Sequence, residues 1–238
     1  MSPETGSSSF ADDTRVQRGI SSGADCMSLQ EDLNSLYNWA VNTGMEFNST
    51  KFELLRFWAS EEDKPNVNYL APNGDIIEEK ASLRDLGVRV SSNLSFTEQI
   101  EMAAKAGERM SGWALRTFRG RGKLLMLTVL QTLIQPQLDY CSQLWSPRDQ
   151  GGINRLEAVQ KQFISKIKSP ELNGKDYWEK LSALRVYSQE CRRERYQICL
   201  LWKQSQDLAE GFKVKWQWTK GGGDMAYSRI FQEVLHLV

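Results

Sequence analysis

The sequence predicts an α+β protein, in which a small antiparallel sheet with one packed helix precedes an all-α region. In roughly the first 96 residues, short apolar runs are separated by turn residues. From Phe96 onward, apolar residues recur at helical spacing instead. Strands followed by helices are typical of an α+β unit joined to a helical unit, and 238 residues suffice for two small cores.

The N-terminal region combines a polar leader, a turn and a helix. Residues 1–9 (MSPETGSSS) are small and polar, and we expect them to be disordered. A turn and a short strand are expected over residues 10–22. A helix follows from Asp25 to a natural stop at Gly44, because four apolar residues share one helical face: Leu29, Leu33, Leu36 and Ala40.

Strand signals follow this helix. FELLRFW at 52–58 is typical of a buried strand, and segments 67–70 and 75–79 flank a Pro-Asn-Gly turn that favours a hairpin. Residues 86–90 predict a further strand with Gly87 inside it.

The rest of the chain has helical periodicity. A first helix is expected after Phe96, a second over residues 124–135 ended by Pro136, a third around 153–167 and a last one over 188–210. The first has small residues on its apolar face, which allow close packing: Ile100, Ala103, Ala104, Gly107 and Met110. The tail, 211–238, shows no clear pattern and is expected to be irregular.

The net charge of zero hides an asymmetry between the two halves. Residues 1–100 hold 8 Lys/Arg and 16 Asp/Glu, a charge of −8, whereas residues 101–238 hold 22 and 14, a charge of +8. A basic half favours a polyanionic partner such as nucleic acid, although a solvated helical surface gives the same count.

The cysteines and the hydropathy argue against several classes of protein. The four cysteines form no CxxC pair and His236 is the only histidine, so a zinc site is not expected. Four cysteines are also sparse for a disulfide scaffold. No apolar run approaches the ~18 residues of a membrane span, so we expect a soluble, intracellular protein without membrane partners.

Asp12 and Asp13 are the sharpest local feature. Two adjacent carboxylates on a tight turn can hold divalent metal at a polymerase primer end, where the metal assists attack by a 3′-hydroxyl. Aspartates also favour turns for local reasons, because their side chains bond nearby backbone amides.

Longer motifs around this doublet resemble one family. In chain order they are SFADDT (9–14), LYNWAVNTGMEFNSTKFELLRF (36–57), RDLGVRVSSNLSFTEQI (84–100), LIQPQLDYCSQLWSP (133–147), INRLEAVQKQFISKI (153–167), YWEKLSALRVYS (177–188) and RRERY (192–196). The sequence is similar to the palm and thumb of reverse transcriptases from non-LTR (LINE-type, jockey-like) retrotransposons, from about Ser9 to Lys203.

The resemblance implies domains and residue roles. Residues 10–96 would be a partial, truncated antiparallel palm sheet, and 97–210 a helical thumb and connection. Asp12 and Asp13 would be catalytic Mg²⁺ ligands, and Lys51 a proton donor to pyrophosphate. The residues that would contact the primer are Leu86, Gly87 and Val88. Phosphates of an RNA/DNA template–primer duplex would be contacted by Arg116, Arg119, Arg121, Lys123, Lys161 and Lys166.

The chain departs from the family in ways that bear on activity. The fingers, an earlier palm strand and a third aspartate would all precede residue 1, so we expect the polymerase activity to be incomplete. The alternative is a non-catalytic helical protein-interaction domain, and self-association through an exposed palm edge is also expected. Four tryptophans are expected to be core residues rather than base-stacking platforms: Trp113, Trp145, Trp178 and Trp202.

Overall fold

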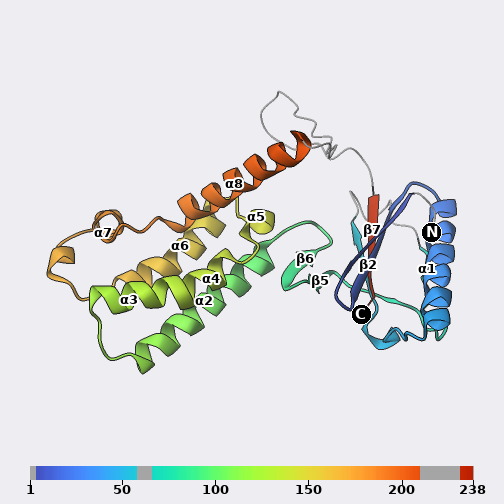
Figure 1. Cartoon of the computed structure of the whole chain (residues 1–238), viewed down its shortest axis with the longest axis horizontal. Coiled ribbons are helices and arrows are strands. Elements are labelled where there is room, and N and C mark those ends of the chain that lie inside the picture. The colour runs from blue at the N-terminus through green and yellow to red at the C-terminus, as the bar shows by residue number, and fades with distance from the viewer. Residues whose placement is uncertain (1–3, 58–65, 210–230, 238) are drawn as a thin grey trace. The chain divides into compact units, whose positions relative to one another are not determined.

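The computed structural model describes residues 4–57, 66–209 and 231–237, and it confirms the α+β class. The chain forms two compact units. Unit 1 holds the residues up to Ser95 together with the C-terminal strand, and unit 2 begins at Phe96. Figure 1 shows strands and one long helix in unit 1 and only helices in unit 2.

Unit 1 is built on a five-stranded sheet with the order β1-β2-β7-β3-β4. The strands are β1 (Thr5–Phe10), β2 (Asp13–Ile20), β3 (Glu53–Phe57), β4 (Glu78–Glu79) and β7 (Phe231–Leu237). Neighbours pair antiparallel except β3 and β4, which pair in parallel. The sheet is therefore mixed, with an antiparallel majority.

The polar leader is not disordered along its whole length. Residues 5–10 form β1, whose pairing with β2 runs from Thr5 opposite Arg18 to Phe10 opposite Asp13. Ser-rich sequences have little strand propensity of their own, but pairing with an ordered neighbour overrides propensity. The expectation of a disordered 1–9 segment is thus wrong for residues 5–9.

The C-terminal tail also contains regular structure. Residues 231–237 form β7, which lies between β2 and β3 and pairs antiparallel with both. The expectation of an irregular tail fails here because strand pairing between residues more than 170 positions apart leaves no local signal.

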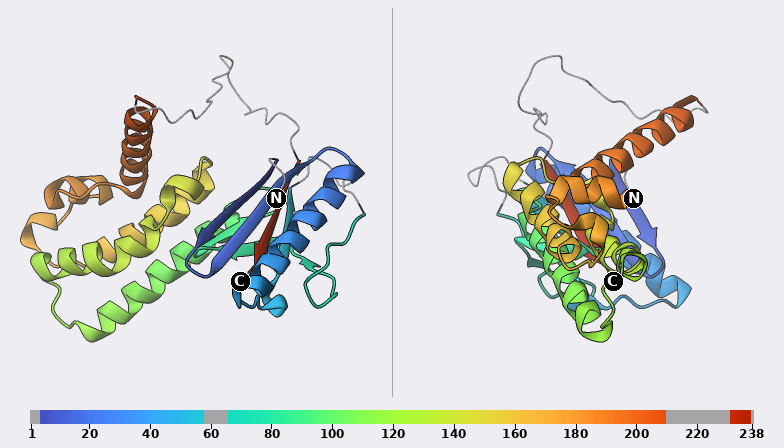
Figure 2. Two further views of the ribbon diagram at one scale, coloured as in Figure 1. Left: turned by 45° about the vertical axis from the view of Figure 1, so that its right-hand side comes forward. Right: turned by 90° about the vertical axis from the view of Figure 1, so that its left-hand side faces the viewer.

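Helix α1 (Gly23–Thr43) lies against the sheet, as Figures 1 and 2 show. Its predicted apolar face is confirmed, since Leu29 and Leu33 are fully buried. The predicted stop is also confirmed, because Gly44 caps the helix with a left-handed φ of 72°. The core between helix and sheet also includes Tyr37, whose ring stacks on Phe52 at 5.9 Å between centroids.

Two hairpins complete unit 1. In the first, Ile77 N–H donates to the Tyr69 carbonyl, and Gly74 has the left-handed φ (85°) that its turn requires, as predicted. The second pairs β5 (Ser82–Asp85) with β6 (Val88–Ser91). The single strand expected over 86–90 is wrong, because Leu86 and Gly87 form the turn with φ of 45° and 87°. A two-residue type I′ turn requires positive φ at both positions.

Unit 2 is a helical bundle. Its longer helices are α2 (Thr97–Thr117), α6 (Gln150–Ile164) and α8 (Gln189–Ala209). The shorter ones are α3 (Lys123–Val129), α4 (Gln135–Asp139), α5 (Ser142–Trp145) and α7 (Tyr177–Leu184). The predicted apolar face of α2 is buried, apart from a half-buried Met110.

Pro136 does not end its helix, contrary to expectation. The chain passes from α3 through a π-helical turn (Leu130–Ile134) into α4, with Pro136 in the first turn of α4. Proline lacks an N–H and clashes with the preceding turn of a regular α-helix. The wider turn, in which Gln135 N–H reaches the Leu130 carbonyl, accommodates the proline.

Gly107 marks the closest packing in unit 2. A Cβ at this position would lie 3.0 Å from Leu138 Cδ2 and 3.1 Å from Val159 Cγ1. The glycine therefore lets α2 approach both α4 and α6.

Candidate functional site

The acidic doublet lies at the tip of the β1–β2 hairpin, on the tight turn that the sequence predicts. Phe10 and Asp13 are the last paired residues, and Ala11 turns the chain with a left-handed φ of 54°. Asp12 is exposed and Asp13 is half-buried.

A small open pocket of about 210 Å³ connects this hairpin with the β5–β6 turn. Asp13 lines it from β2, and Asp85 and Leu86 line it from the second hairpin. Arg15 Nη1 donates to Asp85 Oδ2 at 2.7 Å and so joins the two hairpins. The remaining lining residues belong to the first hairpin: Ser8, Ser9, Phe10, Thr14 and Arg15. Two segments that the sequence associates with catalysis and primer contact therefore meet in one place.

The other predicted residues of this group lie outside the pocket. Asp12, Gly87 and Val88 are next to lining residues but are not part of the wall. Lys51 is exposed at the end of a 3-10 turn (Ser49–Lys51) that precedes β3, and it does not line the pocket either. Its role as a proton donor stays a prediction.

The two carboxylates of the turn, Asp12 and Asp13, are candidate ligands for a magnesium ion that keeps most of its waters. Asp12 and Asp13 offer carboxylate oxygens, the ligand type that Mg²⁺ prefers, and Mg²⁺ often takes only one or two carboxylates and keeps its waters. Within the described ranges, no group of three or more His, Cys, Asp or Glu side chains is placed to enclose a metal. The carboxylates of this turn are of the type that a partly hydrated ion takes, and a Mg²⁺ site here stays a prediction.

The predicted basic residues gather at one end of unit 2, which we call the basic end (residues 116–123 and 161–168). A parallel β-bridge joins Gly122 to Lys168, and Lys168 N–H donates to the Arg121 carbonyl at 2.8 Å. This bridge places the loop after α2 beside the segment that follows α6.

The cations of the basic end are not equivalent. Arg121 donates to the Leu115 carbonyl at 2.6 Å, so its guanidinium caps α2, and Lys123 pairs with Glu171 at 2.6 Å. Lys161 lies over the Tyr177 ring at 5.8 Å from its centroid. In contrast, three of the six predicted side chains are exposed and form neither an ion pair nor a ring contact with any described residue: Arg116, Arg119 and Lys166. These three are the cations best placed to meet a phosphate.

Three of the four tryptophans expected in the core are exposed instead. Trp145 is buried, but Trp113, Trp178 and Trp202 are 47%, 60% and 66% exposed. Trp113 makes an edge-to-face contact with Phe118 at 6.1 Å, just before Arg119, and Trp178 follows Tyr177. The sequence did contain a pattern that could have predicted exposed rings, because these aromatic residues lie among basic ones. Rings in such a setting can stack on nucleic-acid bases.

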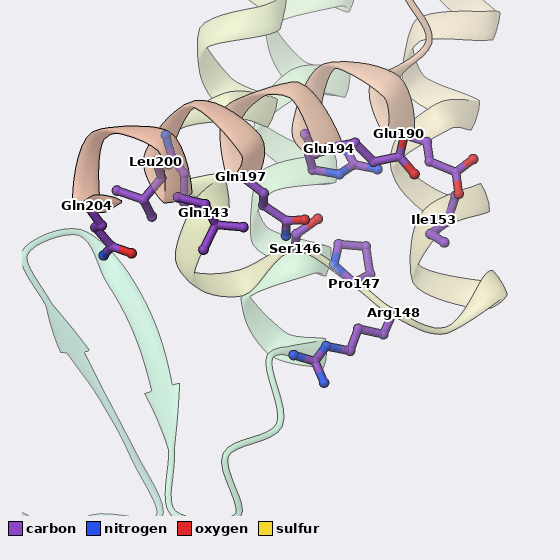
Figure 3. Close-up of a pocket in the computed structure, with 12 residues that line it drawn as sticks. Gln143, Ser146, Pro147, Arg148, Ile153, Glu190, Glu194, Gln197, Leu200 and Gln204 are labelled. Carbon is purple, nitrogen blue, oxygen red and sulfur yellow. The ribbon is translucent and has the colours of Figure 1, made fainter. Parts of the chain in front are cut away.

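A second, larger pocket of about 550 Å³ lies between α8 and the segment from Gln143 to Ile153. Figure 3 shows Glu190, Glu194 and Gln197 of α8 facing Ser146 and Pro147. Arg148 and Arg193 contribute two positive charges to the wall, and the two glutamates cancel them. Burial lowers the pKa of Arg193, although nearby carboxylates oppose the shift. Because the positive and negative charges of its wall are equal in number, this pocket does not favour binding of a polyanion.

Comparisons with known proteins found no matching family model, curated protein or solved structure. Across the part of the chain that the structure describes, no helix has the length and apolar character needed to cross a lipid bilayer.

Proposed function

We propose that this chain is the palm and thumb portion of a LINE-type reverse transcriptase, with an incomplete catalytic centre, and that its helical unit binds RNA/DNA template–primer duplex. The observation that carries the proposal is the Gly122–Lys168 bridge, because it brings the two basic segments together on one end of the unit. The motifs of the sequence and the charge of +8 over residues 101–238 support the same reading.

The binding mode follows from the side chains at the basic end. Arg116, Arg119 and Lys166 would each neutralise a backbone phosphate and release condensed counterions, which gives affinity without sequence preference. The exposed Trp113 ring would add stacking on an unpaired base at the end of the duplex.

The metal chemistry proposed for unit 1 is limited. Asp12 and Asp13 would hold one hydrated Mg²⁺, which supplies charge neutralisation at phosphate oxygens when bound. Asp13 and Leu86 share a pocket wall, so the β5–β6 turn would position a primer end beside that carboxylate.

The test is a titration of fluorescent RNA–DNA hybrid with the full chain, read by anisotropy at low salt. Arg116→Gln/Arg119→Gln should weaken binding by at least about tenfold, because each lost phosphate contact costs on the order of 1 kcal/mol. The matched control is Arg148→Gln/Lys203→Gln, which removes two exposed cations of the same unit away from the basic end. Equal affinities for both double variants would overturn the proposal.

One observation favours the alternative, a helical protein-interaction domain. The second half of α8 exposes a cluster of apolar side chains: Ile198, Leu200, Leu201 and Trp202. Contiguous exposed apolar surface is typical of protein-interaction sites. If the chain failed to bind hybrid and Ile198→Ser/Trp202→Ser abolished its self-association, this alternative would replace the first proposal.

A further inference from the structure

The larger pocket of unit 2 holds a buried arginine whose guanidinium lacks an acceptor. Arg193 of α8 is 2% exposed and lines the pocket of about 550 Å³ between α8 and the segment from Gln143 to Ile153. Its Nη1 and Nη2 atoms are buried and have no hydrogen-bond partner among the described residues. Buried polar side chains almost always have such partners, so this exception points to a group that the pocket would receive.

The charge of Arg193 is compensated, although its hydrogen bonds are not made. Asp139, Glu157 and Glu190 all act on the guanidinium electrostatically. Two of these carboxylates bind other groups, since Glu157 accepts two backbone N–H groups at the start of α8 and Asp139 Oδ2 accepts from Arg192 at 2.6 Å. The guanidinium therefore needs acceptor atoms and not further negative charge, which favours an uncharged ligand over an anion.

The shape of the guanidinium narrows the chemistry of this ligand. Its N–H groups form a rigid, planar fork that matches two adjacent acceptor atoms. The O6 and N7 atoms of guanine are such a pair on an uncharged ring, and arginine binds them with two hydrogen bonds. Because no described residue accepts from the Nη atoms of Arg193, the side chain can turn toward acceptors in the pocket without breaking a hydrogen bond.

The other walls of the pocket suit a nucleobase. Pro147 and Ile153 on one side and Leu200 on α8 offer apolar contacts to the faces of a ring (Figure 3). Glu190 and Glu194 line the pocket as well, and their carboxylates are acceptors for the N1–H and N2–H groups of guanine. The volume lies within the range of roughly 300–1,000 Å³ that is typical of ligand sites.

We propose that this pocket binds a guanine base, with Arg193 donating to O6 and N7 and a glutamate of α8 accepting from N1–H and N2–H. The base belongs to a free nucleoside or to an unpaired nucleotide of a strand, since both present the same edges. The inference rests on the walls of this pocket and is independent of the proposed duplex binding at the basic end.

The test measures binding of guanosine, which carries no phosphate, to the full chain by isothermal titration calorimetry. We expect saturable binding to the parent and no binding to Arg193→Met. Arg195→Gln is the matched control, because Arg195 is exposed on the same helix and is not part of the pocket wall. No binding of guanosine to the parent, or equal binding to Arg193→Met, would overturn the proposal.

A second readout separates ligand binding from a structural role of Arg193. A buried guanidinium without acceptors destabilises the free protein, so Arg193→Met should have the same Tm as the parent or a higher one. Arg193→Lys keeps the charge but loses the planar fork, and it should bind guanosine at least about tenfold more weakly. A lower Tm in Arg193→Met together with undiminished guanosine binding in Arg193→Lys would show that Arg193 only supports the fold.

Base analogues test the individual contacts. The analogue 7-deazaguanosine lacks the N7 acceptor and inosine lacks the N2 amino group, so each should bind at least about tenfold more weakly than guanosine. Glu190→Ala/Glu194→Ala should reduce the preference for guanosine over inosine. Adenosine presents a donor in place of O6 and should not compete. If adenosine bound as tightly as guanosine, the assignment to guanine would be wrong.

Two short RNA strands distinguish the sources of the base. The strands UUGUU and UUAUU compete with guanosine at high salt, where phosphate contacts contribute little. Displacement of guanosine by UUGUU alone would assign the pocket to an unpaired guanine of a strand, and displacement by neither would assign it to the free nucleoside. Equal displacement by both strands would contradict the selection of guanine.

Discussion

Arg15 and Asp85 are separated by 70 positions in the sequence, yet the Arg15 guanidinium donates to the Asp85 carboxylate at 2.7 Å. This ion pair ties the hairpin that carries Asp13 to the hairpin that carries Leu86. Both residues of the pair also line the pocket between the two turns.

A double-mutant cycle of Arg15→Ala and Asp85→Ala should give a coupling of about 0.5–1 kcal/mol in urea unfolding. The two side chains are 35% and 16% exposed, so solvent screening keeps the pair near the surface range. Hydrogen exchange of residues 82–91 should speed up in both single variants. A coupling of zero would mean that the hairpins are held together by other contacts.

Mn²⁺, used as a paramagnetic substitute for Mg²⁺, should broaden the amide resonances of Asp12, Asp13 and Leu86. The first two would be ligands, and Leu86 lies across the same pocket from Asp13. Asp12→Asn/Asp13→Asn should abolish the effect, because it removes both anionic oxygens from the turn. Persistent broadening in the double variant would place the metal elsewhere.

Gly107→Ala should destabilise the protein by about 1–2 kcal/mol. Overpacking costs about 1–3 kcal/mol, which exceeds the gain of up to about 1 kcal/mol in helix propensity. The added Cβ would meet Leu138 and Val159 at 3.0 and 3.1 Å. Gly112→Ala is the matched control on the same helix, since its Cβ would meet only the end of the Arg116 side chain at 3.4 Å. Thermal unfolding should separate them, with Gly112→Ala equal to or more stable than the parent.

The acid stability of unit 1 should depend on Asp25. Its carboxylate accepts the backbone N–H of Ser21 at 3.0 Å and the Ser22 hydroxyl at 3.0 Å, and these bonds lower the pKa of Asp25 below its ordinary 3.8. A lowered pKa in the folded state adds stability that is present above about pH 3.8 and lost as the pH falls through the folded value. Asp25→Asn should therefore cost on the order of 1 kcal/mol at pH 7 and less at pH 3. Urea unfolding at the two pH values measures this; an equal loss at both would assign the effect to packing.

The longer helices were predictable because each carries its own periodic signal, whereas the short helices α5 and α7 were not predicted. Leu29 and Leu33 in α1, and Ala103 and Gly107 in α2, face the core as their spacing indicates. Strands β1 and β7 were not predictable, since β1 consists mostly of Ser and Gly and β7 depends on partners far away in the sequence. The prediction that Pro136 ends a helix was wrong because the preceding π-helical turn accommodates the proline.

The candidate site likewise has features that the sequence predicted and features that it did not. The turn at Asp12-Asp13 was visible in the sequence, whereas residues 86–90 predicted a strand and not the turn at Leu86-Gly87. The Arg15–Asp85 pair joins the two turns at one pocket, and this side-chain contact has no local pattern in the sequence. At the basic end, the cations were visible, but their division into paired and unpaired ones required the positions of Glu171 and the Leu115 carbonyl.

The salt dependence of hybrid binding tests the central claim most directly. The logarithm of the association constant is measured against the logarithm of salt concentration for the full chain and for Arg116→Gln/Arg119→Gln. With phosphate contacts from Arg116, Arg119 and Lys166, we predict a slope of about −3 for the parent, reduced by about two in the double variant. A parent slope near zero, or the same slope in both proteins, would contradict a nucleic-acid interface at the basic end.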